Sequence, residues 1–142
     1  MTQTTEFKQS GHLNPALTDP ATRVLNAEQL TGRWVNTNRR TRGIAECVVE
    51  RDGEGLSVSV SGVGEAGPTP WPKGRALVLA NLEEEAGQRT VALAVDFDFG
   101  FMRAETQIRV NKGVLVIVLF NTFHDGSGRA DYVTREFFYR AD

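Results

Sequence analysis

Two side chains near the C-terminal end of the chain could carry acid–base chemistry. His124 stands beside Asp125, and a histidine next to a carboxylate is the usual material of a general base. Adjacent residues of an extended chain point in opposite directions, so an ordinary exposed turn residue is the alternative for His124. Tyr132 follows soon after, and its phenol could donate a hydrogen bond to a ligand carbonyl while its ring lines a cavity. Tyr132 is therefore the first candidate for a polar ligand contact.

Three carboxylates fall inside segments that we expect to be strands. Outward-facing is the default for Glu46, Glu105 and Glu136, whereas a carboxylate directed inward becomes a candidate acid or base. Glu46 shares its parity with the apolar Ile44, and Glu136 shares its parity with Tyr132, so both are less certainly exposed than Glu105. Glu46 joins Tyr132 and His124 as a candidate catalytic group.

Aromatic residues near the ends of the expected strands could line a binding site. Trp71 lies between Pro70 and Pro72, which hold it stiffly at a rim, where it is either a lid or a packing residue. The candidate substrate-binding residues share bulky apolar side chains: Trp71, Phe99, Phe101, Met102, Phe120 and Phe123. Asp96 and Asp98 are too few for a metal site and are expected to cap turn backbone.

Motifs for cofactors and metals are missing. Gly62 to Gly67 is rich in glycine but lacks the following Lys-Ser/Thr of a phosphate-binding loop, so we interpret it as a flexible loop. Cys47 is the only cysteine, and the chain has 2 histidines, which are too few soft ligands for a structural zinc site. Cys47 is expected to be a small buried hydrophobic residue. We therefore expect no metal and no cofactor.

Length and charge restrict the class of protein. The 142 residues suit one domain, and 40% hydrophobic with 24% charged residues are typical of a soluble globular chain. The net charge is −2 without a long basic run, so nucleic acid is not an expected partner. The longest apolar run, Val114 to Phe120, is far shorter than the roughly 20 residues that span a bilayer, and no signal segment begins the chain. We expect a cytoplasmic protein without membrane contact.

The chain is organised as an arm followed by a β domain. Residues 1–18 are polar and aperiodic and predict a flexible arm, and residues 19–142 predict a single barrel domain. Asn26 and Gln29 have the spacing of a capping box and predict a helical turn that ends near Leu30. Period-two patterns with intervening Gly and Asn turns then predict eight strands. These run over 33–38, 43–50, 56–62, 75–82, 89–97, 101–110, 114–123 and 131–140.

Eight short strands joined by hairpins favour an all-β, antiparallel up-and-down barrel, because closure removes unpaired edges. Such a barrel either is filled by side chains or holds one small ligand. Residues 91–95 and 114–120 are apolar on both faces, so their outer surface must be covered. A homodimer through these strands is one candidate, and the N-terminal segment is the other.

The segment Leu30-Thr31-Gly32-Arg33-Trp34 resembles the start of the first strand in the calycin superfamily, which contains the lipocalins, fatty-acid-binding proteins and avidins. Val35-Asn36 is similar to the avidin version, although the biotin-stacking aromatics of avidin and the middle motif of lipocalins are not matched. In lipocalins an arginine closing the last strand lies across that tryptophan, and the resemblance therefore implies structural roles for Trp34 and Arg140. In architecture alone, the expected barrel is also similar to small bacterial polyketide cyclases of the Diels–Alderase type.

These patterns favour a barrel that binds a small apolar molecule. The leading hypothesis is a cofactor-independent cyclase or isomerase, for example a [4+2] cyclase, which folds an apolar natural-product intermediate into a reactive conformer by proximity and orientation. The alternative is a non-catalytic lipocalin-like carrier or sensor of a small apolar molecule. A filled barrel that acts as an interaction scaffold is the third.

Overall fold

The computed structural model describes residues 19, 21, 23–24, 28–80 and 88–141. The predicted arm at residues 1–18 lies outside the described residues, as do Asn26, which should begin the predicted helical turn, and residues 81–82 at the end of the predicted strand over 75–82. Residues 28–30 form a turn, and no α-helix occurs in the described part of the chain.

The fold is all-β, as the sequence predicts. The strands β2 to β11 form one antiparallel sheet, and the short β1 adds a parallel pair with β8. Their bounds are β1 Arg23–Val24, β2 Gly32–Asn36, β3 Ile44–Asp52, β4 Gly55–Gly64, β5 Gly67–Pro70, β6 Gly74–Arg75, β7 Leu77–Ala80, β8 Gln88–Asp98, β9 Met102–Asn111, β10 Val114–Phe123 and β11 Tyr132–Ala141.

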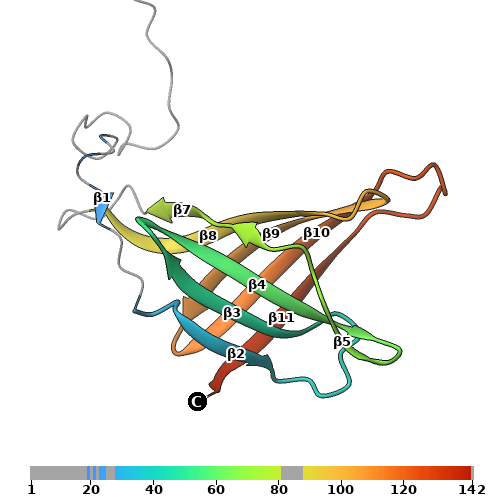
Figure 1. Ribbon diagram of the computed structural model, residues 1–142, viewed down its shortest axis with the longest axis horizontal. Coiled ribbons are helices and arrows are strands. Elements are labelled where there is room, and N and C mark those ends of the chain that lie inside the picture. Colours follow the sequence, from blue (N-terminus) through green and yellow to red (C-terminus); the bar gives the residue numbers. More distant parts are fainter. Residues whose placement is uncertain (1–18, 20, 22, 25–27, 81–87, 142) are drawn as a thin grey trace, which may run out of the picture.

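The sheet curls strongly but does not close. Its order is β1-β8-β9-β10-β11-β2-β3-β4-β5, with β6 beside β4 and β7 beside β8 (Figure 1). The expected strand over 75–82 is divided: Arg75 of β6 pairs with Ser57 of β4, whereas Leu77 of β7 pairs with Ala94 of β8. Because the segment changes partner within two residues, no continuous ladder joins β4 to β8. The prediction of a closed, eight-stranded barrel is therefore wrong: the antiparallel sheet has ten strands in the described residues.

A second difference lies in the glycine-rich segment that we interpret from sequence as a flexible loop. It forms a hairpin in which Gly64 of β4 pairs with Gly67 of β5. Gly67 has φ +118, a conformation that L side chains rarely adopt, so glycine is required there. Pro68 and Pro70 suit β5 because it ends the strand order, where a missing N–H breaks no inner ladder.

The core follows the predicted alternation along most strands. On β9, Ala104, Thr106 and Ile108 are buried while their neighbours Glu105 and Gln107 are exposed. The fully buried large side chains all belong to the concave side: Trp34, Ile44, Val49, Leu56, Leu93, Phe97, Ile108, Leu115, Ile117 and Phe138, with Leu30 packed against them. This core leaves one end of the sheet open.

The outer face of β10 and β11 is apolar, as the sequence indicates for 114–120. Phe120, Val133, Phe137 and Tyr139 are exposed there. Val118 pairs with Arg135, whose guanidinium carbon lies 5.2 Å from the centre of the Phe137 ring. The homodimer through these strands stays a prediction.

Candidate functional site

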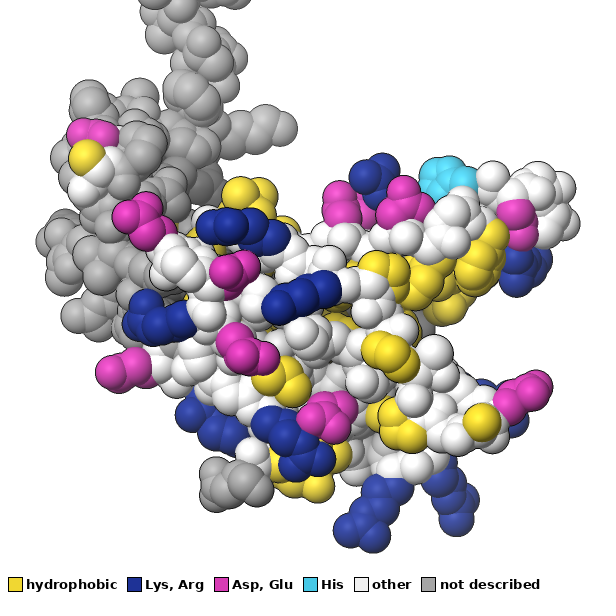
Figure 2. Space-filling model, viewed as in Figure 1, with side chains coloured by type: hydrophobic (Ala, Val, Ile, Leu, Met, Phe, Trp, Pro, Cys, Tyr) yellow, Lys and Arg dark blue, Asp and Glu magenta, His cyan; other side chains and the backbone are white. Residues whose placement is uncertain are grey.

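A pocket of about 630 Å³ opens at the end of the sheet where β5, the β2–β3 loop and the start of β11 meet. Figure 2 shows the molecule hollowed on this side, between the projecting end of β10 and β11 and the β4–β5 hairpin. Apolar and polar side chains line it together: Asn38, Arg40, Thr41, Arg42, Gly43, Gly62, Val63, Trp71, Met102, Leu119, Asn121, Tyr132, Thr134, Arg135 and Glu136. This volume and mixture are typical of small-molecule sites.

Trp71 forms one wall of the pocket and is held by packing. Its indole ring meets Phe97 and Phe99 edge to face, with ring centres 5.2 and 5.0 Å apart. Its backbone N–H donates to the carbonyl of Val60 at 2.8 Å. Gly62 makes room for the indole, because a Cβ at this position would lie 2.4 Å from Nε1 of Trp71. Trp71, between Pro70 and Pro72, is therefore a packed residue of the pocket wall.

Glu136 on β11 is the most highly connected polar side chain of the pocket. Its carboxylate accepts hydrogen bonds from Asn36 Nδ2 at 3.1 Å, from Thr41 Oγ1 at 2.5 Å and from the N–H of Ile44 at 3.3 Å. Gly43 lies so close that a Cβ there would be 2.8 Å from Oε2. These bonds tie β11 to β2, to β3 and to the loop between them. Parity with Tyr132 was the only sequence signal for this role.

Tyr132, Thr134 and Glu136 form a polar row along the inner face of β11. Alternate residues of a strand share a face and lie about 6.7 Å apart, so the row extends along the pocket. Leu119 pairs with Thr134 on the neighbouring β10. Met102 of β9, which we predict from sequence to be a substrate-binding residue, also lines the pocket. A molecule in the pocket therefore meets polar groups along β11 and along the β2–β3 loop, and apolar groups at Val63, Trp71, Met102 and Leu119.

Asn121 is a pocket residue that the sequence analysis missed. It is only 4% exposed, and no hydrogen bond of its side-chain amide occurs among the described residues. The other buried asparagine, Asn36, donates to the carbonyl of Ile44 at 2.9 Å. Its burial could have been predicted from the alternation of β10, since Asn121 follows Leu115, Ile117 and Leu119 on the same inner face.

Glu46 lies outside the pocket, on the outer face of the sheet. The β3–β4 register shifts between Ile44 and Glu46, and this β-bulge reverses parity, so that Ile44 and Cys47 are both buried. The Glu46 carboxylate accepts from Nε of Arg33 at 2.6 Å. Alternation counted from Ile44 is therefore wrong beyond the bulge, and Glu46 does not meet the other candidates.

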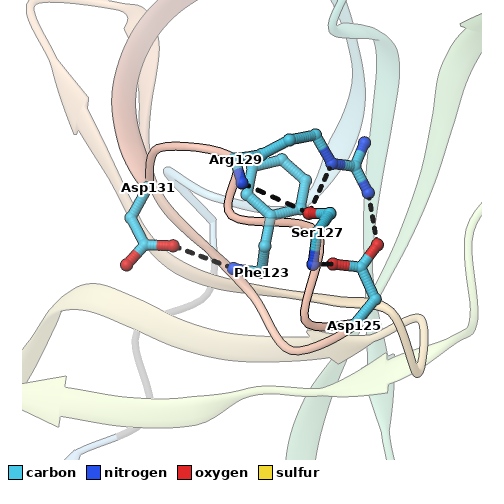
Figure 3. Close-up of polar contacts among 5 residues, drawn as sticks. All are labelled: Phe123, Asp125, Ser127, Arg129 and Asp131. Atoms are coloured by element: carbon cyan, nitrogen blue, oxygen red, sulfur yellow. Dashed lines mark hydrogen bonds and ion pairs between the residues drawn. The ribbon is translucent and has the colours of Figure 1, made fainter.

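His124 also lies away from the pocket, in the exposed β10–β11 loop. Its Nε2 is 3.0 Å from Oγ1 of Thr122. The neighbouring Asp125 is hydrogen-bonded to other residues: its carboxylate accepts from the N–H of Ser127 at 3.0 Å and from Arg129 at 2.6 Å (Figure 3). Hydrogen bonds from Ser127, together with Arg129, lower the pKa of Asp125 to about 2. The His–Asp pair is a sequence neighbour only.

The remaining aromatic candidates lie either behind Trp71 or beside the β10–β11 loop. Phe99 packs on Trp71, behind the pocket wall. The guanidinium carbon of Arg129 lies 4.2 Å from the centre of the Phe123 ring and 5.7 Å from that of Phe101. Asp131 accepts from the N–H of Phe123 at 2.9 Å, which closes the loop (Figure 3). Phe120 points outward and is 51% exposed.

Comparison of the chain with models of known protein families, with curated proteins and with solved structures finds no match. The resemblance of residues 30–36 to calycins therefore stays an expectation from the residues themselves. Within the described residues, no group of three or more His, Cys, Asp or Glu side chains is placed to hold a metal ion. No helix in that part of the chain is long and apolar enough to cross a membrane.

Proposed function

We propose that the protein binds a small, mainly apolar molecule in the pocket at the open end of the sheet. The observation that carries this proposal is the pocket of about 630 Å³, which Trp71, Met102 and Leu119 line together with the polar row of β11. Convergent polar groups in an apolar hollow orient a ligand, whereas the apolar walls supply most of the binding free energy. The calycin resemblance supports the same proposal, because calycins hold ligands within their barrels.

The proposed activity is that of a cofactor-independent cyclase or isomerase. Such an enzyme gains rate by holding a flexible substrate in its reactive conformer and by polarising a carbonyl with a hydrogen-bond donor. The lining supports this activity because it is not purely aliphatic: Tyr132 offers a phenol at the pocket mouth.

A carrier or sensor is the second candidate, and Glu136 favours it. Its carboxylate already accepts three hydrogen bonds from Asn36, Thr41 and Ile44, so it acts as an anchor of the β2–β3 loop and has little capacity left for proton transfer. A carrier would release the molecule that it binds unchanged.

Two substitutions at consecutive positions of β11 test the binding site. Thr134 faces the pocket and Val133 faces outward with 59% exposure, so Thr134→Trp fills the pocket and Val133→Trp is the matched control on the other face. Native mass spectrometry of protein from its own source should detect a bound small molecule in the wild type and in Val133→Trp, and none in Thr134→Trp. Equal retention in both variants would place the molecule elsewhere.

Chemical identification of that molecule separates the two candidates. If it is a product that the purified protein forms from an open-chain or isomeric precursor, the protein is an enzyme. If the precursor is converted no faster with the protein than in buffer alone, the protein is a carrier.

A further inference from the structure

Asn121 and Tyr132 lie directly opposite each other on β10 and β11. Directly opposite residues of an antiparallel pair project from the same face, with Cβ atoms about 4.5–5.5 Å apart. Both side chains line the pocket. No hydrogen bond of either side chain occurs among the described residues, so the buried Asn121 amide and the half-exposed Tyr132 hydroxyl both offer donors to the pocket.

The burial of Asn121 makes this absence of a partner informative. At 4% exposure the residue has little access to water, and a buried polar group without a partner destabilises the fold. The residue opposite Asn121 on β9 is Ala104, whose side chain has no polar atom. A molecule that enters the pocket can reach the amide and supply the missing partner.

From these two residues we infer that the pocket recognises a carbonyl oxygen, which accepts hydrogen bonds from the Asn121 amide and the Tyr132 hydroxyl. The inference rests on the proposed function, and it specifies the ligand: an apolar carbonyl compound such as a ketone, ester or lactam. Leu119 and Met102 lie next to the two donors on the same side of the sheet and would contact the apolar body. Paired donors on one carbonyl oxygen also stabilise negative charge that develops there.

A matched pair of fluorescent probes tests the inference. 6-Propionyl-2-(dimethylamino)naphthalene carries a carbonyl on an apolar ring system, and 2-(dimethylamino)naphthalene is the same ring system without it. We expect the wild-type protein to bind the carbonyl probe about tenfold more tightly, the scale of one net hydrogen bond. The carbonyl probe should also emit at longer wavelength when its oxygen is hydrogen-bonded than when Asn121 is replaced.

Three variants locate the effect. Asn121→Leu should remove the tenfold preference while the probe without the carbonyl binds as before, and Tyr132→Phe should reduce the preference severalfold. Asn121→Asp keeps the shape of the side chain and removes its donors once the new carboxyl is ionised, so it should also remove the preference as the pH is raised. Gln107→Leu, on the exposed outer face of β9, is the control and should leave both affinities unchanged. Thermal unfolding of each variant shows whether it is folded. If Asn121→Asp does not fold, the comparison of the two probes on the wild-type protein still tests the inference.

The outcomes distinguish this inference from the proposed function. If neither probe binds, or if Thr134→Trp does not block binding, the proposed pocket function fails and the inference fails with it. If both probes bind equally to the wild type and Thr134→Trp blocks both, the pocket function stands and the carbonyl site is overturned. Persistence of the preference in folded Asn121→Leu, which carries no donor at any pH, would likewise overturn the donor role of Asn121.

Discussion

The guanidinium carbon of Arg140 lies 4.7 Å from the centre of the Trp34 ring, at the end of the sheet opposite to the pocket. Arg140 also donates to the carbonyl oxygens of Glu28 at 3.2 Å and Gln29 at 2.8 Å, while Nε1 of Trp34 donates to that of Leu30 at 2.9 Å. The ring is therefore fixed on its face and at its edge. This contact joins the first long strand to the last, because Arg140 pairs with Trp34 across β11 and β2.

Trp34→Ala should destabilise the fold by roughly 3–5 kcal/mol, because it removes a 1% exposed ring from the core and leaves the Arg140 guanidinium without its aromatic partner. Urea denaturation followed by circular dichroism measures the change. Val35→Ala, at the neighbouring half-buried position, is the control and should cost clearly less. A urea midpoint of unfolding equal to that of the wild type would show that Trp34 does not stabilise the core at this end of the sheet.

Glu136→Gln should loosen the β2–β3 loop without unfolding the sheet. The new amide N–H₂ would face one of the groups that now donate to the carboxylate, at a cost of about 1–3 kcal/mol. Hydrogen exchange should quicken at the Ile44 amide, which donates to Oε2. Glu105→Gln on the exposed outer face should leave that exchange rate unchanged. Unaltered protection in Glu136→Gln would contradict the anchoring role.

Cys47 should be almost unreactive in the folded protein. Burial, and to a smaller extent the negative charge of Glu46, raises the pKa of the thiol from 9.0 to about 12, which reduces the thiolate at pH 8 roughly a thousandfold. Reaction with 5,5′-dithiobis(2-nitrobenzoate) should therefore require unfolding in urea. The folded pKa lies above the unfolded value, so stability should fall as the pH rises above 9. Rapid labelling of the native protein would show that Cys47 is accessible.

The Asp125 carboxylate should stay ionised to unusually low pH. Its pKa of about 2 lies below the ordinary value of 3.8, so the contribution of its bonds to loop order is present above pH 3.8 and disappears as the pH falls through 2. An NMR titration of the side-chain carboxyl carbon measures this midpoint. Ser127→Ala should raise the midpoint towards 3.8 by removing the hydroxyl. A wild-type midpoint near 3.8 would mean that the loop bonds in Figure 3 do not form in solution.

The ends of most strands could be predicted closely from sequence. The predicted 114–123 matches β10, and 101–110 differs from β9 by one residue at each end. Alternation predicts the buried residues of β9 and, apart from the buried Ser57, the apolar core residues of β4, because the period-two geometry of a strand is a local property. The divided strand at β6 and β7 was not predictable in this way. Its change of partner between Arg75 and Leu77 depends on where β4 and β8 lie, and these are remote in sequence.

The candidate site was predicted only in part for the same reason. Met102 and Tyr132 line the pocket from strand ends that the sequence pattern indicates, whereas Trp71 lines it from the end of β5, a strand that the pattern does not predict. Glu46 was placed wrongly because a single bulge reverses the parity of every residue after it. Pairing His124 with Asp125 failed because Asp125 bonds to Ser127 and Arg129 within its own loop.

What the sequence by itself determined is the all-β class, the inward face of most strands and the apolar outer face of β10, since each depends on neighbours two residues apart. Only the tertiary structure decided that the sheet stays open and that a pocket forms at one end. It also decided the roles of Glu136, whose carboxylate bonds to Asn36 at a sequence separation of 100 residues, and of Asn121, which is buried beside Tyr132. The physical reason is that backbone periodicity is a local property, whereas a partner across the sheet is chosen by the curvature of the whole sheet.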